Sequence, residues 1–133
     1  MKDDCIFCKI VKSEIKISKI YEDKECFAIL DKFPATEGQT LVITKKHYPY
    51  ILDVEDNEYS HIFKIAKKIA NALDKTFKPE RTCFVVEGFH VPHVHIKLYP
   101  VKEKHLVLTG TRELSDLEAI ELSDKIRKIY NGK

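Results

Sequence analysis

The chain has 133 residues, of which 44% are hydrophobic and 33% are charged, and its 23 basic and 21 acidic residues leave a net charge of +2. That length suits one domain with its own core, so we expect a single domain over residues 1–133. The balanced charge offers no basic surface for nucleic acid or membrane, so we expect no nucleic-acid or membrane partner. No apolar run is long enough to span a bilayer, and the polar start MKDDCIFCKI is unlike a signal peptide. We therefore expect a cytoplasmic protein.

The first half of the chain predicts short strands followed by a long helix. Residues 19–31 are typical of two strands around a polar turn at 22–25, and residues 40–44 form a β-branched strand after the turn Glu37-Gly38. From residue 53 to residue 77, apolar residues recur at spacings of three and four, which predicts an amphipathic helix. The acidic residues at its start favour the first turn of a helix.

The second half predicts two more strands and a second helix. Residues 81–88 and 93–101 are strand-like, with a turn or bulge between them. Residues 115–130 predict an amphipathic helix with Ser115 as N-cap and four apolar residues on one side: Leu117, Ile120, Ile126 and Ile129. Strands in a meander-like order with two separated helices predict an α+β fold on an antiparallel sheet.

Histidine and lysine alternate with apolar residues in the segment VPHVHIKLYP. Side chains two apart on a strand share a face, so His93, His95 and Lys97 are expected on one face and the apolar residues between them in the core. One interpretation is an exposed polar face. Because histidine is scarce and has only modest strand preference, we favour a site that needs neutral imidazole, as nucleophile, base or metal ligand.

Cys5 and Cys8 form a CxxC motif without a second CxxC in the chain. A zinc ion would need histidines to complete four ligands, and the available histidines are His47, His90, His93, His95 and His105. The alternative is that the two cysteines pack as small hydrophobic residues. We expect the remaining cysteines, Cys26 and Cys83, to be buried in the core. We expect His61 and His105 to lie on the solvated surface.

Four segments, CIFCKIVKSEI, IYEDKECFAILD, GQTLVITKKHY and VPHVHIKLYP, together resemble the histidine triad (HIT) family in order and spacing. The resemblance covers about residues 4–101, and the helix at about 115–130 adds little to it. It implies a HIT-like fold, with an antiparallel sheet of about five strands and two main helices, assembled as a homodimer. It also implies a nucleotide-binding hydrolase or nucleotidyl transferase that attacks an α-phosphate.

The resemblance assigns roles to single residues. His95 matches the middle histidine of the family's His-x-His-x-His motif, which is the nucleophile, and a neutral imidazole nitrogen suits that task. Asp31 matches the acidic residue that holds the ribose hydroxyls. Three apolar residues lie near the positions that form the slot for the base: Ile10, Ile20 and Leu30.

The same resemblance implies a structural zinc ion. In the CxxC-bearing members, the first motif histidine and an upstream histidine close the site, which here gives Cys5, Cys8, His47 and His93. Four protein ligands leave no open position, so the metal would be structural rather than catalytic.

The sequence departs from the family pattern at two places. Lys97 replaces the third motif histidine; an ammonium can neutralise a phosphate oxygen, but it does not readily exchange protons at pH 7. The loop before the motif is shortened to VVEGFHVPH, with Phe89 and His90 where glutamine and serine or threonine usually stand. One hypothesis makes His90 the general acid, which requires a bulge or turn that brings it round to His95; the alternative is a surface-loop histidine.

We therefore expect a nucleotide hydrolase that cleaves a nucleoside phosphoramidate, an acyl-nucleotide or a dinucleoside polyphosphate through a nucleotidyl-histidine intermediate. Its partner would be a purine nucleotide or nucleotide conjugate. Two alternatives stay open: a zinc-stabilised nucleotide-binding module with weak or no turnover, for which Lys97 and the shortened loop speak, and a nucleotidyl transferase.

Overall fold

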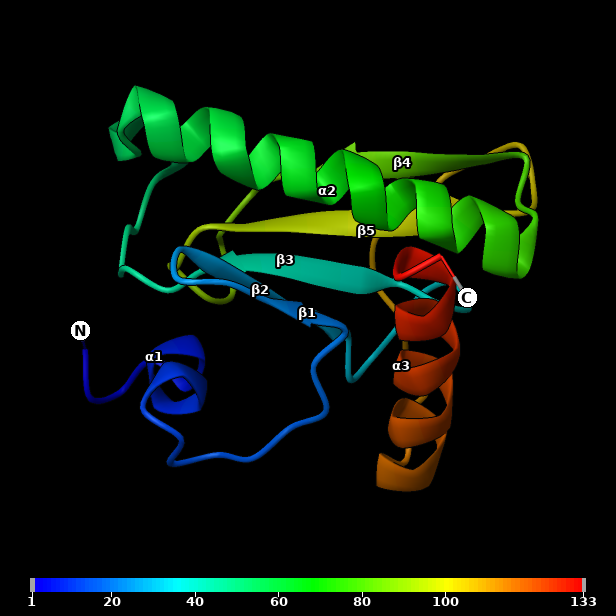
Figure 1. Ribbon diagram of the computed structural model, residues 1–133, viewed down its shortest axis with the longest axis horizontal. Helices are drawn as coiled ribbons and strands as arrows, with labels where there is room; N and C mark the ends of the chain where they lie inside the picture. The colour runs from blue at the N-terminus through cyan, green and yellow to red at the C-terminus, as the bar shows by residue number, and fades with distance from the viewer. Residues whose placement is uncertain (1, 133) are drawn as a thin grey trace.

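The computed structural model describes residues 2–132 and contains one five-stranded sheet in the order β1-β2-β3-β5-β4, with all neighbours antiparallel. This confirms the predicted α+β fold. The strands and helices (Figure 1) are α1 (Ile6–Val11), β1 (Tyr21–Glu22), β2 (Cys26–Leu30), β3 (Thr40–Thr44), a 3-10 turn (Ile51–Asp53), α2 (Asp56–Phe77), β4 (Arg81–Val85), β5 (His95–Val101) and α3 (Asp116–Tyr130).

The sheet is covered on both faces. α2 lies across one face with α3 beside it, and the short helix α1, which the sequence pattern did not predict, covers part of the other (Figure 1). Every residue of β2 and β3 is therefore buried, and alternate residues belong to different cores. Ala28 and Val42 pack under α2, whereas Phe27 and Ile43 pack against α1.

The predicted alternation along β5 is confirmed. Val94, Ile96 and Leu98 are buried in the core under α2, while His93 and His95 both contact the ring of Phe7 on the α1 side. The regular strand begins at His95 rather than at residue 93, and β4 ends at Val85 rather than at residue 88. The segment between the two strands is thus a loop longer than the sequence pattern predicted.

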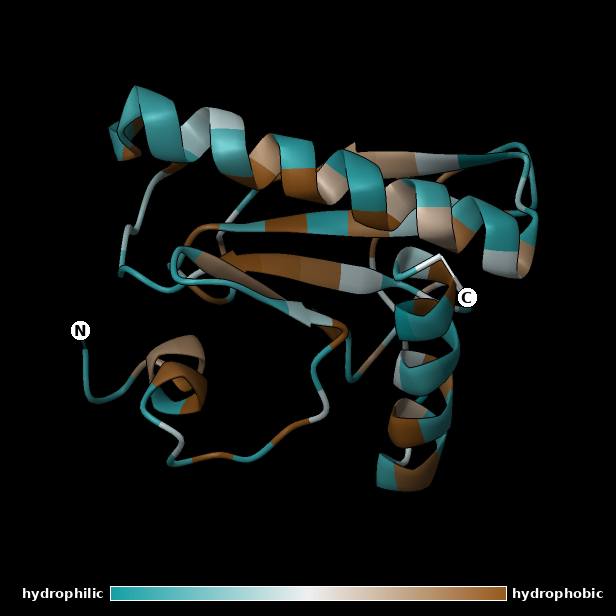
Figure 2. Ribbon diagram, in the orientation of Figure 1, coloured by the Kyte–Doolittle hydropathy of each residue, from teal (hydrophilic) through white to brown (hydrophobic). Residues whose placement is uncertain are grey.

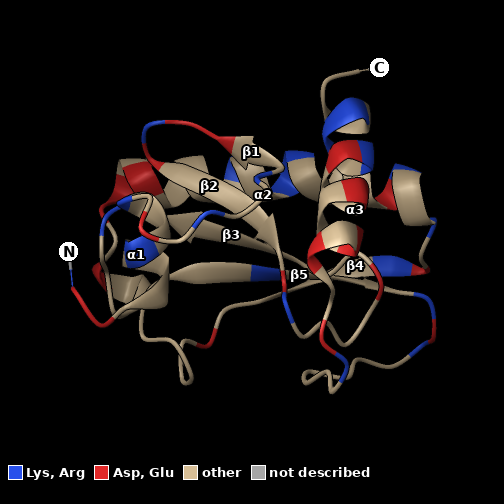
Figure 3. Ribbon diagram, turned by 90° about the horizontal axis from the view of Figure 1, so that it is seen from below, with Lys and Arg blue, Asp and Glu red and all other residues tan. Residues whose placement is uncertain are grey.

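α2 is amphipathic, and Figure 2 shows apolar and polar segments alternating along it. The helix begins at Asp56, three residues later than predicted, because Ile51–Asp53 form a 3-10 turn and Val54 has an extended backbone. Over the described residues, no helix combines the length and the apolar composition that crossing a membrane requires. Lys and Arg are interspersed with Asp and Glu over the helices and loops (Figure 3).

α3 has the predicted N-cap but not the predicted apolar face. Ser115 accepts a hydrogen bond from the Glu118 N–H, and the Glu118 carboxylate accepts one from the Ser115 N–H, which makes a capping box. Ile126 is fully buried, but Leu117 and Ile120 are 65% and 47% exposed, so the prediction for these two is wrong. The face of α3 that packs on the core carries Ala119, Leu122, Ile126 and Ile129, and Leu117 lies on the opposite side of the helix from Ile126.

A compact hydrogen-bonded turn joins β1 to β2. Asp23 Oδ1 accepts bonds from the backbone N–H groups of Glu25 and Cys26, and Asp23 Oδ2 accepts from Tyr21 Oη at 2.7 Å and from His61 Nε2 at 2.6 Å. His61 is therefore partnered rather than merely solvated, which corrects the sequence prediction. Cys26 is buried as predicted, but Cys83 is only partly buried, since β4 is an edge strand.

We expect Asp23→Asn to destabilise the protein in a pH-dependent way. Burial raises the pKa of Asp23, but the bonds from Tyr21 and His61 outweigh it and hold that pKa well below its ordinary value. A lowered folded-state pKa adds stability above the ordinary aspartate pKa of about 4, and this stability is lost as pH falls below it. Urea unfolding should show the variant about 1–3 kcal/mol less stable at pH 7, with the gap narrowing between pH 4 and pH 2.

The control for this prediction is Asp53→Asn, which changes an exposed aspartate in the turn before α2. It should alter the unfolding free energy by less than about 0.5 kcal/mol. A gap between wild type and Asp23→Asn that stays constant from pH 7 to pH 2 would contradict the ionic role of the turn.

Candidate functional site

A groove of about 850 Å³ opens on the α1 side of the sheet. Its floor is formed by residues of β2, β3 and β5, and its rim by α1, residues 15–18, the loop at 87–91 and the segment from 108 to 120. Most of the sequence-predicted site residues line it: Ile10, Leu30, Asp31, His90, His95 and Lys97. Ile20 does not; it is 2% exposed and packs in the core under α2.

Cys5, Cys8, His47 and His93 form a tight cluster beside this groove, and their ligand atoms all lie within 4.8 Å of one another. Cys5 Sγ is 3.3 Å and Cys8 Sγ is 3.6 Å from His93 Nδ1. Cys8 Sγ is 3.3 Å from His47 Nδ1, and the two Nδ1 atoms are 3.1 Å apart. The structure thus brings together the four residues that the family resemblance implied.

These separations fit a tetrahedral zinc ion. With Zn–S of about 2.3 Å and Zn–N of about 2.0–2.1 Å, a tetrahedron has S–N edges of about 3.6 Å and an N–N edge of about 3.3 Å. His93 is also prepared as a ligand: its Nε2–H donates to the Thr44 carbonyl at 2.6 Å, which leaves Nδ1 unprotonated for a metal. Burial lowers the pKa of His93 to about 4, so the neutral form prevails. The Cys₂His₂ cluster therefore suggests a zinc site.

Local structure explains why residues so distant in sequence meet. Cys5 is the N-cap of α1 and Cys8 lies in its first turn, so both face the sheet beside Phe7. β3 and β5 are antiparallel neighbours, so His47, just beyond the end of β3, lies next to His93, just before the start of β5. The cluster joins α1 to the end of the sheet from which His95 projects.

His95 is a neutral, oriented imidazole in the floor of the groove. It is 4% exposed, it lies opposite Ile43 in the β3–β5 register, and the ring of Phe7 packs edge-on with centroids 5.1 Å apart. His95 Nδ1 is 2.6 Å from the His93 carbonyl oxygen. Because a carbonyl only accepts, Nδ1 carries the proton and Nε2 keeps its lone pair. Burial lowers the pKa of His95, which keeps it neutral at pH 7.

Lys97 is not a free ammonium but one half of an ion pair. Its Nζ donates to Glu87 Oε2 at 2.8 Å, and the side chains of Lys97 and Glu87 are only 16% and 21% exposed. Glu87 Oε1 also accepts the backbone N–H of Phe89. Sequence analysis missed Glu87, because a single glutamate in a loop carries no signal of a partner ten residues away.

Asp31 is held by a buried glutamine. Gln39 Nε2 donates to Asp31 Oδ2 at 2.8 Å, the Phe33 N–H donates to Asp31 Oδ1 at 3.0 Å, and Gln39 Oε1 accepts from the Ala35 N–H at 2.7 Å. Gln39 was also missed as a site residue, although it stands in the GQTLVITKKHY segment directly after the turn glycine Gly38. Its burial and its bond to Asp31 become visible only in the fold, so the sequence held no signal for it.

His90 lies in the exposed loop between β4 and β5, and it lines the same groove as His95. The chain turns sharply just after it, with the His93 N–H donating to the Val91 carbonyl at 2.8 Å. A turn thus separates His90 from the strand that carries His95, and the role of His90 as general acid stays a prediction. His105 is mostly exposed, as predicted.

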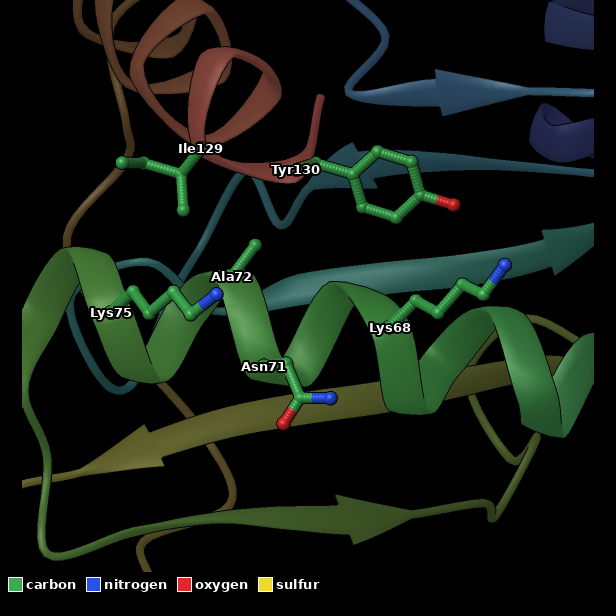
Figure 4. Close-up of a pocket in the computed structure, with 6 residues that line it drawn as sticks. All are labelled: Lys68, Asn71, Ala72, Lys75, Ile129 and Tyr130. Atoms are coloured by element: carbon green, nitrogen blue, oxygen red, sulfur yellow. The ribbon is translucent and has the colours of Figure 1, made fainter. Parts of the chain in front are cut away.

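A smaller hollow of about 290 Å³ lies between α2 and the end of α3 (Figure 4). Ala72 points toward α3 and Ile129 toward α2 across it, and its polar lining comes from helix-surface residues such as Lys68 and Lys75. None of the sequence-predicted site residues lines this hollow, so the groove is the candidate site.

The sequence and the fold of this chain are both similar to those of known proteins. The pattern described as HIT domain matches residues 12–104. An uncharacterized HIT-like protein of Methanocaldococcus jannaschii is 32% identical over 127 residues, which cover 92% of this chain and 98% of that protein. In fold, the chain resembles a Hit-like protein of Bartonella henselae with a TM-score of 0.86 and 29% identity over 96% of both chains.

Some of the relatives are named as enzymes. The adenosine 5'-monophosphoramidase HNT1 of Saccharomyces cerevisiae is 37% identical over 101 residues, covering 75% of this chain and 64% of the yeast protein. The adenylylsulfatase HINT3 of Arabidopsis thaliana is 32% identical over 109 residues, covering 78% of this chain and 55% of the plant protein. The relatives therefore include hydrolases of adenosine nucleotides.

Proposed function

This chain belongs to the HIT domain family, and we propose that it is a nucleotidyl hydrolase that cleaves at the α-phosphate of a nucleoside phosphoramidate, an acyl-nucleotide or a dinucleoside polyphosphate. The observation that carries the proposal is the state of His95: Nδ1 donates to the His93 carbonyl, so an unprotonated Nε2 is held in the groove that Asp31 and Lys97 also line. The named activities of the yeast and plant relatives support it.

In this proposal the reaction has two displacements. His95 Nε2 attacks the α-phosphorus, an N–P bond forms, and the bond from phosphorus to the leaving group breaks. His90 is proposed to protonate the leaving group, and the Lys97 ammonium to balance charge on the phosphate oxygens. Water then attacks the same phosphorus and gives its proton to His90, which the first step left unprotonated. The N–P bond breaks, and the nucleoside monophosphate leaves with His95 neutral again.

The groove supplies a place for the rest of the nucleotide. Asp31, fixed by Gln39, has acceptor oxygens suited to ribose hydroxyls. Ile10 and Leu30 also line the groove and are proposed to contact a purine base, although most of the Leu30 side chain packs in the core under α2. Ile20 does not line the groove and would support it only by packing in the core under α2.

β4 is an edge strand of the sheet, and we expect a second copy of the chain to pair there in a homodimer.

We also propose that Cys5, Cys8, His47 and His93 hold a structural zinc ion. A bound zinc supplies cross-linking rather than catalysis here, since four protein ligands leave no position for water or substrate. What these residues do is fix α1 and the start of β5, and with them Phe7 and the ring of His95.

Release of a nucleoside monophosphate from a substrate panel tests the proposed function. The panel contains an adenosine and a guanosine phosphoramidate, an aminoacyl-adenylate mimic and a dinucleoside tetraphosphate, and wild type is compared with Lys97→His. We expect turnover of at least one substrate by wild type, and the preferred substrate identifies the leaving group that the groove accepts.

The Lys97–Glu87 ion pair favours one alternative, a nucleotide-binding module with weak or no turnover, because it ties up the charge that would meet the phosphate. Turnover that appears only in Lys97→His would support that alternative. No turnover by either protein, with nucleoside monophosphate still bound, would refute the hydrolase.

A further inference from the structure

Glu87 connects two parts of the groove that carry candidate catalytic groups. One carboxylate oxygen accepts from Lys97 Nζ on β5, and the other accepts from the Phe89 N–H in the loop that carries His90. Both ionic side chains are more than three-quarters buried, and both line the groove. A single carboxylate thus fixes the position of the ammonium and the path of the loop.

The pair is placed where substrate charge would meet it. Leu41 and Lys97 are register partners, as Ile43 and His95 are, so the lysine follows His95 by one pleat on the same face. Unsupported, a lysine side chain has four rotatable carbons and no fixed direction. A charge-assisted hydrogen bond at 2.8 Å removes that freedom and directs the ammonium along the groove wall.

We propose that Glu87 is a positioning residue, which holds the Lys97 ammonium where it meets the substrate phosphate and so gives this lysine the fixed geometry that a ring side chain would have by itself. The inference rests on the proposed function only in taking the phosphate to lie beside His95. It goes beyond that function in assigning a role to a loop glutamate that no part of the motif resemblance contains.

The opposite role for Glu87 is simple neutralisation, in which its charge weakens the pull of Lys97 on phosphate. Positioning, independent action and neutralisation predict different coupling between Glu87 and Lys97 in the affinity for phosphate. If Glu87 positions Lys97, removing Glu87 makes Lys97 contribute less to phosphate binding. If Glu87 and Lys97 act on the phosphate as independent fixed charges, their effects are additive, and if Glu87 only neutralises Lys97, the contribution of Lys97 grows.

A double-mutant cycle with AMP as ligand separates these roles. The four proteins are wild type, Glu87→Gln, Lys97→Met and the double variant, each with zinc bound and measured by titration calorimetry. Phe89 and Lys97 bond to different oxygens of Glu87, and glutamine presents an NH₂ group in place of one of them, so it does not keep both bonds. Methionine keeps the lysine stem without its charge. We expect Lys97→Met to weaken AMP binding about tenfold in wild type but less than about threefold in the Glu87→Gln background.

The same four proteins are also compared by their kcat for hydrolysis of adenosine phosphoramidate. Glu87→Gln should lower kcat about tenfold in wild type and less than about twofold in Lys97→Met. The control is Glu103→Gln, which makes the same charge change on an exposed glutamate outside the groove and should leave both AMP affinity and kcat within about twofold. Should Glu87→Gln not fold, Glu87→Asp replaces it, since the shorter carboxylate cannot reach both partners.

Additive effects, or a larger effect of Lys97→Met in the Glu87→Gln background, would overturn the inference, as would wild type that does not bind AMP. Failure of the proposed function looks different: wild type would bind AMP but release none from the phosphoramidate, and the affinity cycle would still decide the role of Glu87.

Discussion

Replacing His95 with alanine should lower kcat/KM for nucleoside monophosphate release at least about a thousandfold, because the proposed reaction has no other route to the covalent intermediate. AMP should still bind, since Asp31, Gln39 and the apolar wall of the groove are untouched. Kinetics on the substrate that wild type prefers, together with calorimetry on AMP, measure both quantities.

His105→Ala is the matched control for this variant, since it removes an exposed imidazole outside the groove and should leave kcat/KM within about twofold. The thermal midpoint of His95→Ala has to be checked, because His95 is buried and its ring packs on Phe7. A folded His95→Ala protein that keeps more than about a tenth of wild-type kcat/KM would show that another group attacks the phosphorus.

Cys8→Ser should lose both zinc and stability. Purified wild type is expected to hold about one zinc per chain, and the variant close to none, because serine does not replace a thiolate in a Cys₂His₂ set. A site that is saturated at 100 times its dissociation constant contributes about 2.7 kcal/mol to folding, which corresponds to a drop in Tm of about 10 °C for a domain of this size. Elemental analysis and calorimetry measure the two effects.

Cys83→Ser makes the same substitution at a partly buried cysteine on the edge strand, outside the cluster. It should leave the zinc content unchanged and shift Tm by much less. Wild type without zinc, or Cys8→Ser with unchanged zinc and Tm, would contradict the structural-metal proposal and leave the cluster as packed cysteines and histidines.

The parts of the fold that follow from local periodicity could be predicted from the sequence. The alternation through His93 and His95 gave the correct faces of β5, and the spacing of three and four gave α2 to its last residue, Phe77. The short helix α1 was missed, because its six residues are too few to show a period, and such a helix depends on tertiary packing of Phe7 and Ile10.

Contacts that depend on how distant segments meet could not be predicted. The placement of Leu117 beside Ile126 was instead an error of periodicity, since nine residues are two and a half turns at 3.6 residues per turn and put the two side chains on opposite sides of α3. Gln39 and Glu87 reveal themselves only through partners across the fold, Asp31 and Lys97. The motif resemblance thus identified the groups proposed to bind substrate and to react, and the structure identified the groups that hold two of them, Asp31 and Lys97, in place.

The stereochemistry at the α-phosphorus shows whether His95 attacks it. An adenosine thiophosphoramidate of one known configuration is hydrolysed in ¹⁸O-labelled water, and the configuration of the labelled product is determined by NMR. Two in-line displacements, the first by His95 and the second by water, invert the phosphorus twice, so attack by His95 predicts net retention. Net inversion would mean that water attacks the phosphorus directly, and would contradict the role assigned to His95.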